Sequence, residues 1–132
     1  MIDYSNEIFT RIANAVWEAH GKEVQCIGEY VAVPKRFPCV TIDEIFNIPA
    51  ERDSGEQKYS AVAYRVQVFS NLETGKRAEA RKIFGTVSDA MYGLNLMGKT
   101  YTTTPEVYNS TIYQIKATFE GTIGKDGVIY RR

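Results

Sequence analysis

The sequence predicts a single α+β domain over residues 1–132, with a mixed, antiparallel-rich sheet and two main helices packed on one face. Three observations predict this class. Two segments repeat apolar residues at helical spacing, several others alternate apolar and polar residues, and an Asp-Gly pair near the end marks a hairpin turn. The expected order is α-β-β-β-α-β-β-β. At this length a core forms without disulfides or metal.

The first helix is expected over residues 4–20, between Asp3, which can cap its N-terminus, and Gly21, which supplies a left-handed stop. Its apolar face consists of residues at helical spacing, namely Ile8, Ile12, Ala15, Val16 and Ala19. Trp17 lies near the edge of this face, so we expect its ring to be partly exposed.

Three strands are expected before the second helix. Val24–Ile27 comes first, Pro34 and Pro38 then break any regular ladder, and Cys39–Ile45 resumes the alternation. Lys58–Ser70 is the clearest strand of the chain. Its span of about 43 Å is long for a compact domain of this size, so it is expected to bend or to project as a hairpin arm.

Residues 46–57 are expected to form a long polar loop. The segment is rich in turn-forming residues, namely Pro49, Asp53, Ser54 and Gly55. Loops of this length are often functional, or disordered until they bind. Ile48–Gln57 is therefore a candidate docking arm, and an ordinary disordered surface loop is the alternative.

The second helix carries the most complete amphipathic face of the chain. Its apolar positions follow helical spacing throughout: Ala80, Ile83, Phe84, Val87, Ala90, Met91 and Leu94. Asn71 or Thr74 is expected to cap its N-terminus.

The last third of the chain is expected to be β structure. Thr100–Thr104 forms a strand that Pro105 ends, and Thr111–Glu120 alternates apolar and polar residues. Asp126-Gly127 marks a hairpin turn, after which Val128–Arg131 returns as a short edge strand.

The formal net charge of zero is the sum of two opposite halves. Residues 1–66 hold 10 acidic and 7 basic side chains, and residues 67–132 hold 6 acidic and 9 basic ones. A dedicated nucleic-acid binder normally carries a basic excess, so opposite halves favour complementary protein surfaces instead. We expect cytosolic synthesis and no membrane partner, because no apolar run reaches the length of a membrane span and no signal-peptide pattern begins the sequence.

The sequence shows no catalytic constellation, metal site or cofactor motif. His20, the only histidine, ends the first helix, where it complements the helix dipole. Cys26 and Cys39 lack paired ligands for zinc, and Cys39 is expected to be a small buried hydrophobe. Asp43 and Glu44 are adjacent on a strand, so they point to opposite faces and cannot act as a pair. A small enzyme that uses Cys39 or His20 is the alternative.

Nine tyrosines are the main excess in the composition, and most lie in or beside expected strands. Tyrosine suits both sheet packing and subunit interfaces, because one end of its side chain is apolar and the other is polar. Base stacking by an RNA-binding α+β domain is the alternative, although no aromatic motif of the RNA-recognition type is present.

Three segments are informative together: GEYVAVPKRFPCVTIDEI at residues 28–45, YRVQVFSNLETGKRAEARKIFGTVSDAM at 64–91, and YNSTIYQIKATFEGTIGKDGVIYRR at 108–132. Their most specific parts are the FPCVTI strand, the strand-to-helix junction VQVFSNLETGKRAEA, and the IYQIKATFEG ending with its hairpin. In this combination the chain resembles the tail terminator, or tail completion, proteins of long-tailed bacteriophages. The resemblance covers nearly the whole chain, and none of its parts is a catalytic motif.

This resemblance implies a structural protein without catalytic residues or cofactors. Members of the family form a hexameric ring on the last ring of the tail tube, which ends tube polymerisation and presents a surface to the head connector. The implied partners are further copies of the chain, the tail tube protein and the head–tail connector proteins, while DNA passes through the lumen without sequence readout. The implied location is the virion tail at the head–tail junction, reached from the host cytoplasm. A head-side connector or stopper protein is the alternative.

Two sets of residues are candidates for contacts in such an assembly. A subunit or tube interface is expected at the polar loop and the C-terminus, namely Ile48, Glu51, Arg52, Asp53, Glu56, Tyr130, Arg131 and Arg132. The basic start of the second helix is expected to face an acidic partner or the lumen, and comprises Lys76, Arg77, Arg81 and Lys82. A solvated helix face and a frayed C-terminal tail are the alternatives.

Overall fold

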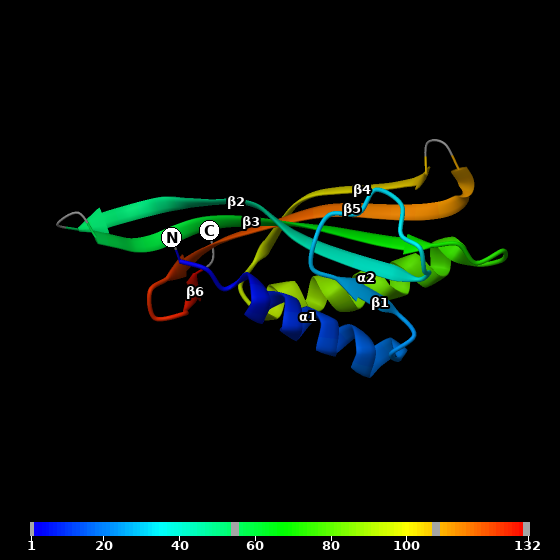
Figure 1. Cartoon of the computed structure of the whole chain (residues 1–132), viewed down its shortest axis with the longest axis horizontal. Coiled ribbons are helices and arrows are strands. Elements are labelled where there is room, and N and C mark those ends of the chain that lie inside the picture. The colour runs from blue at the N-terminus through cyan, green and yellow to red at the C-terminus, as the bar shows by residue number, and fades with distance from the viewer. Residues whose placement is uncertain (1, 54–55, 107–108, 131–132) are drawn as a thin grey trace.

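The computed structural model of the chain (Figure 1) describes residues 2–53, 56–106 and 109–130. The side chains at 50–53, 56–58, 103–106, 109–110 and 130 lie outside the described part. The elements follow in the expected order: α1 (Ser5–His20), β1 (Gln25–Ile27), β2 (Cys39–Asp53), β3 (Glu56–Ser70), α2 (Lys76–Gly93), β4 (Met97–Glu106), β5 (Asn109–Gly124) and β6 (Ile129–Tyr130).

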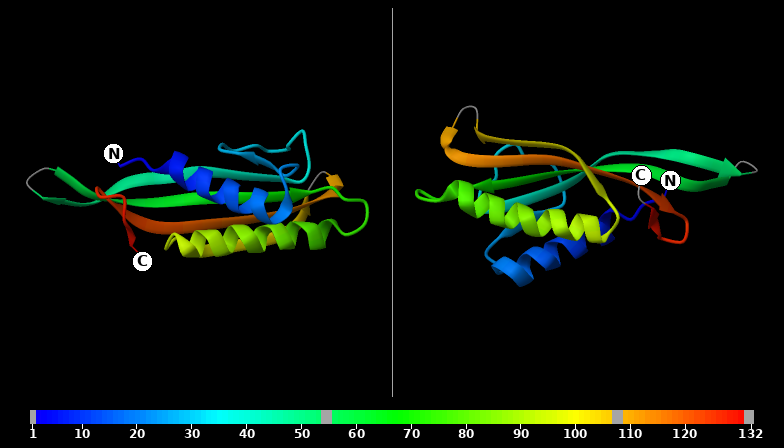
Figure 2. Two further views of the ribbon diagram at one scale, coloured as in Figure 1. Left: turned by 90° about the horizontal axis from the view of Figure 1, so that it is seen from below. Right: turned by 180° about the vertical axis from the view of Figure 1, so that it is seen from behind.

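The described strands form one sheet in the order β1-β2-β3-β5-β4, and β6 pairs with the end of β5. β1 runs parallel to β2, and every other neighbouring pair is antiparallel. Both helices lie on the same face of this sheet (Figure 2). The α+β class and the packing of both helices on one face are therefore confirmed.

The core lies between the two helices and the sheet face that they cover. The helices bury residues at helical spacing: Ile8, Ile12, Ala13 and Val16 from α1, and Ala80, Ile83, Val87 and Met91 from α2. Two expected core positions on α1 differ, because Ala15 is only half-buried and Ala19 is exposed. Trp17 is partly buried as expected, and its Nε1 donates a hydrogen bond to the carbonyl of Val24 (2.8 Å).

The N-cap residue is Tyr4 in α1, not the expected Asp3, and Gly75 in α2, and neither helix has a side-chain cap hydrogen bond. Before α1, Oδ1 of Asp3 accepts bonds from the hydroxyl (2.7 Å) and the backbone N–H (3.0 Å) of Ser5, and these bonds lower the pKa of Asp3. For α2, the prediction that Asn71 or Thr74 caps the N-terminus is wrong. Gly75 precedes the helix in a left-handed conformation (φ 92°), and no side chain caps the N-terminus.

The prediction of a loop at residues 46–57 is wrong. β2 continues to Asp53 and β3 begins at Glu56, so this segment is the distal half of a β2–β3 hairpin. Three register shifts after Glu44 accommodate the irregular sequence around Pro49. Strands of 15 residues extend about 50 Å, and the distal end of the hairpin projects beyond both helices (Figure 1).

The C-terminal third departs from expectation at one proline. β4 runs through Pro105 to Glu106 instead of ending at the proline, because it is an edge strand, where a missing N–H is tolerated. The expected hairpin turn at Asp126-Gly127 is confirmed. Gly127 has a φ of 83°, and the N–H of Gly124 donates to the carbonyl of Val128 (2.9 Å).

Candidate assembly surface

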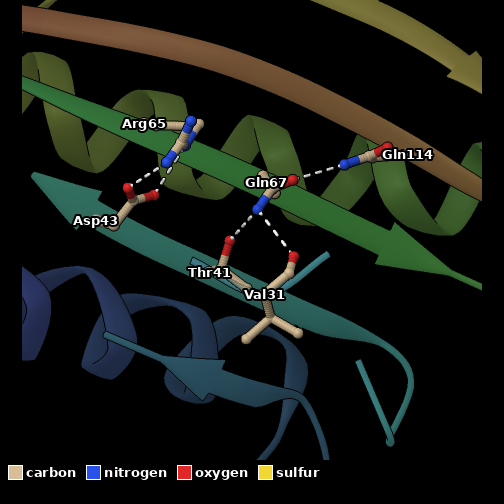
Figure 3. Close-up of polar contacts among 6 residues, drawn as sticks. All are labelled: Val31, Thr41, Asp43, Arg65, Gln67 and Gln114. Atoms are coloured by element: carbon tan, nitrogen blue, oxygen red, sulfur yellow. Dashed lines mark hydrogen bonds and ion pairs between the residues drawn. The ribbon is translucent and has the colours of Figure 1, made fainter. Parts of the chain in front are cut away.

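A buried polar ladder crosses three strands on the sheet face opposite the helices (Figure 3). Nε2 of Gln114 donates to Oε1 of Gln67 (2.7 Å). Nε2 of Gln67 in turn donates to Oγ1 of Thr41 (3.0 Å) and to the carbonyl of Val31 (3.2 Å). The last bond attaches the segment 28–38, which we call the strap, to the sheet. Gln67 and Thr41 are fully buried, so the ladder replaces the bonds that these groups would make to water.

An ion pair lies two residues further along the same strands. Asp43 accepts two hydrogen bonds from Arg65 (2.6 and 3.0 Å), and these bonds raise the pKa of the guanidinium. The ring of Tyr30, in the strap, lies 4.4 Å from the same guanidinium. On the other face Glu44 accepts a bond from the hydroxyl of Tyr64 (3.0 Å). The prediction that Asp43 and Glu44 point to opposite faces is confirmed.

The groups considered for catalysis occupy separate environments. Nε2 of His20 bonds Oγ1 of Thr86 (2.7 Å), which joins the end of α1 to α2. Cys26 lies beside β2 on the helix side of the sheet, and Cys39 packs with Phe69 on the other side. Within the described ranges, no three His, Cys, Asp or Glu side chains are grouped so as to hold a metal ion.

We expect both thiols to resist modification in the folded protein. Burial raises the pKa of Cys26 to about 11 and that of Cys39 to about 12. At about pH 8 the thiolate fraction of Cys26 is therefore about 0.1%, against roughly a quarter for an unfolded cysteine. An Ellman assay should show reaction at least about 100-fold slower in buffer than in denaturant, where both thiols react. Rapid reaction of either thiol in the native protein would contradict this.

The structure divides the basic residues of α2 between two sides of the helix. Arg77 and Arg81 are exposed and follow the spacing of Phe84 and Tyr92, on the side of α2 that faces β4. Lys82 lies on another side, and there it lines a cleft of about 380 Å³ together with His20 and Glu79. Lys76 is half-buried. The four residues therefore do not form one surface.

Of the candidate interface residues, Ile48 is the one whose side chain is described. It lies on the β2–β3 hairpin and is 53% exposed, beside the half-buried Phe46. For the others the structure tests no contact, because their side chains lie outside the described part: Glu51, Arg52, Asp53, Glu56, Tyr130, Arg131 and Arg132.

An aromatic cluster beside β4 was not identified from the sequence. Phe119 is fully buried, and its ring lies 5.9 Å from that of Tyr101 and 6.3 Å from that of Tyr92. The hydroxyls of Tyr92 and Tyr101 are 3.2 Å apart, and both side chains are exposed on their outer side (36% and 48%). The eight-residue spacing of Phe84 and Tyr92 on α2 is a sequence signal for one end of this cluster, but nothing local places Tyr101 against it.

No protein-family model matches the chain, and no curated protein matches it. Neither of the described helices combines the length and apolar character that crossing a membrane requires.

Proposed function

We propose that the protein is a tail terminator of a long-tailed bacteriophage. In this role it forms a ring on the end of the tail tube, stops tube growth and provides the surface that the head connector binds. The proposal begins from the three sequence segments that resemble this family. The α+β fold is compatible with it, as is the division of the chain into an acidic and a basic half.

The structural observation that carries the proposal is the β2–β3 hairpin. Its distal half extends beyond the two helices (Figure 1), and it carries the exposed side chain of Ile48. In the described part of the chain β3 pairs with β5 only from Tyr59 onwards, so the end of the hairpin beyond Tyr59 consists of β2 and β3 alone. Two strands alone are marginally stable in water, because they have little apolar surface to bury. A projecting hairpin with an exposed apolar side chain is therefore well suited to dock against a neighbouring protein, here the tube or an adjacent subunit.

Tube assembly tests the proposal directly. The tail tube protein from the same phage genome is allowed to polymerise with and without this protein, and tube lengths are measured by electron microscopy. We expect added protein to give tubes of limited length with extra density at one end. Unrestrained tube growth in the presence of this protein would contradict the proposal. Binding to filled, tail-free heads instead of tubes would assign the head-side connector role.

The docking role of the hairpin is tested by Ile48→Asp, compared with Leu72→Asp. Both replace an exposed aliphatic side chain, at 53% and 43% exposure, so their effects on folding should be similar and small, and Leu72 lies outside β2 and β4. We expect Ile48→Asp to reduce capping strongly, because a charge would be buried in the docked hairpin. Equal capping of tubes by the two variants would show that Ile48 is not part of the docking interface.

A further inference from the structure

The sheet has two edges along which the described residues form no further strand pairs. β1 pairs with β2 only at Cys39–Thr41, so the outer edge of β2 continues unpaired from Ile42 onwards. β4 pairs with β5 on one side, and no described strand lies on its other side. Unpaired N–H and C=O groups on such edges are a template for pairing with another chain.

Prolines reveal which backbone groups face outward. Pro105 lies in the β4–β5 ladder, and because it has no N–H its nitrogen must face away from β5. Backbone direction alternates along a strand, so Thr103 and Tyr101 also turn their N–H and C=O groups outward. Pro49 marks the outward positions of β2 in the same way, together with Asn47.

The two prolines also limit the lengths of the usable edges. Each proline lacks a backbone N–H donor near the C-terminal end of its strand. The unpaired edge that remains before the proline is Ile42–Ile48 on β2 and Met97–Thr104 on β4. These segments are similar in length. A cleft of about 320 Å³ lies beside the β2 segment, between it and the start of α1, and Ile42 and Glu44 line it.

The strand directions allow only one kind of side-by-side pairing. β2, β3, β5 and β4 alternate in direction across the sheet, so the two edge strands run in opposite directions. When a second copy is placed beside the first in the same orientation, and shifted along the strands so that its β4 clears β1, this β4 meets Ile42–Ile48 of β2 as an antiparallel neighbour. The sheet then continues from copy to copy in the pattern that it already has.

The charges beside the two edges are complementary. β2 contains four acidic residues and one basic residue, Arg52; Asp43 and Glu44 lie on the segment that remains unpaired, and Asp43 is already paired with Arg65. On the other side, β4 carries the exposed Lys99 and ends at Glu106, and the neighbouring side of α2 carries the exposed Arg77 and Arg81. Opposite charges favour this β2–β4 contact over pairing of β4 with a second β4.

From these observations we propose that copies of this chain join head to tail, with β4 of one copy paired antiparallel to β2 of the next. The inference deepens the proposed function, on which it rests for the expectation that the chain assembles with itself. The contact buries the exposed outer sides of Tyr92 and Tyr101 against the neighbouring copy. Because the contact joins two different edges, it forms a ring when the rotation between copies closes.

Site-specific photo-cross-linking tests this contact. Tyr101 is replaced by benzoylphenylalanine, the full chain is irradiated both free and bound to tubes, and cross-linked peptides are identified by mass spectrometry. We expect adducts with residues 42–53 of another copy. Within one copy β4 and β2 are separated by three strand spacings, about 14 Å, so such an adduct is intermolecular. Adducts only with β4 of another copy, only with the tube protein, or with no second copy in either sample would overturn the inference.

A backbone variant provides an independent measurement. Thr103→Pro removes an outward-facing N–H and leaves the β4–β5 bonds intact, whereas Thr103→Val keeps the N–H. Sedimentation of the free and the tube-bound protein, without cross-linking, should show self-association weakened about tenfold or more for the proline variant and unchanged for the valine variant. Circular dichroism tests whether both variants fold. If the proline variant is unfolded, the cross-linking result alone decides whether the edge contact is accepted or rejected.

The two proposals can fail separately. Adducts between β4 and β2 without any effect on tube growth would support the edge contact and reject the tail-terminator role. Capped tubes whose adducts lie elsewhere would retain that role and reject this edge contact.

Discussion

Replacing Phe119 with alanine should lower the free energy of unfolding by about 3–5 kcal/mol, the usual cost of emptying a buried phenylalanine site. Phe119 is fully buried on β5, and its ring contacts Phe84 of α2 at 6.4 Å as well as Tyr92 and Tyr101. Both the helix and the edge strand are held by this one side chain, so neither can close the cavity without moving the other.

Urea denaturation followed by circular dichroism measures this effect. Ile45→Ala is the matched control, because it also removes a large aliphatic side chain but from a site that is 45% exposed. We expect the control to change stability by less than about 1 kcal/mol. Similar losses for both variants would show that Phe119 does not have the packing role described above. Since Phe119 supports Tyr101, its removal should also weaken contacts made through β4.

Local patterns were sufficient to predict the helices. The face of α2 from Ala80 to Met91 depends on a spacing that is fixed by helix geometry, so its core residues could be identified without knowledge of the sheet. The same spacing separates Arg77 and Arg81 from Lys82. The positions of the four basic residues around the helix, on more than one of its sides, are therefore contained in the sequence.

The β2–β3 hairpin could not be predicted in the same way. Pro49, Asp53 and Gly55 are turn formers, and a local interpretation gives a loop. The structure pairs this region with β3, whose alternating pattern supplies a partner for a segment with little strand propensity of its own. The contact of Tyr101 with α2 is also non-local, as is the ladder from Gln114 to Val31. Features of this kind depend on strand order, which no single segment encodes.

Replacing Gln67 with leucine should lower the free energy of unfolding by about 2–4 kcal/mol, because it leaves more than one buried polar group without its partner. Gln67 is fully buried at the centre of the ladder on the helix-free face. Leucine fills a similar volume, but Gln114 then loses the acceptor for its amide, and the carbonyl of Val31 loses its donor. The loss therefore arises from hydrogen bonding and not from a cavity.

The double variant Gln67→Leu/Gln114→Leu distinguishes these causes. Replacing both partners by apolar groups removes the orphaned amide, so the double variant should be less destabilised than the sum of the two single variants. Hydrogen exchange of the strap, residues 28–38, adds a local measurement. Faster exchange there in Gln67→Leu, with helix amides changed only by the global loss, is expected because the bond to Val31 attaches the strap to β3. Additive losses with unchanged strap exchange would mean that Gln67 acts as a packing residue, and the strap would then depend mainly on the stacking of Tyr30 over Arg65.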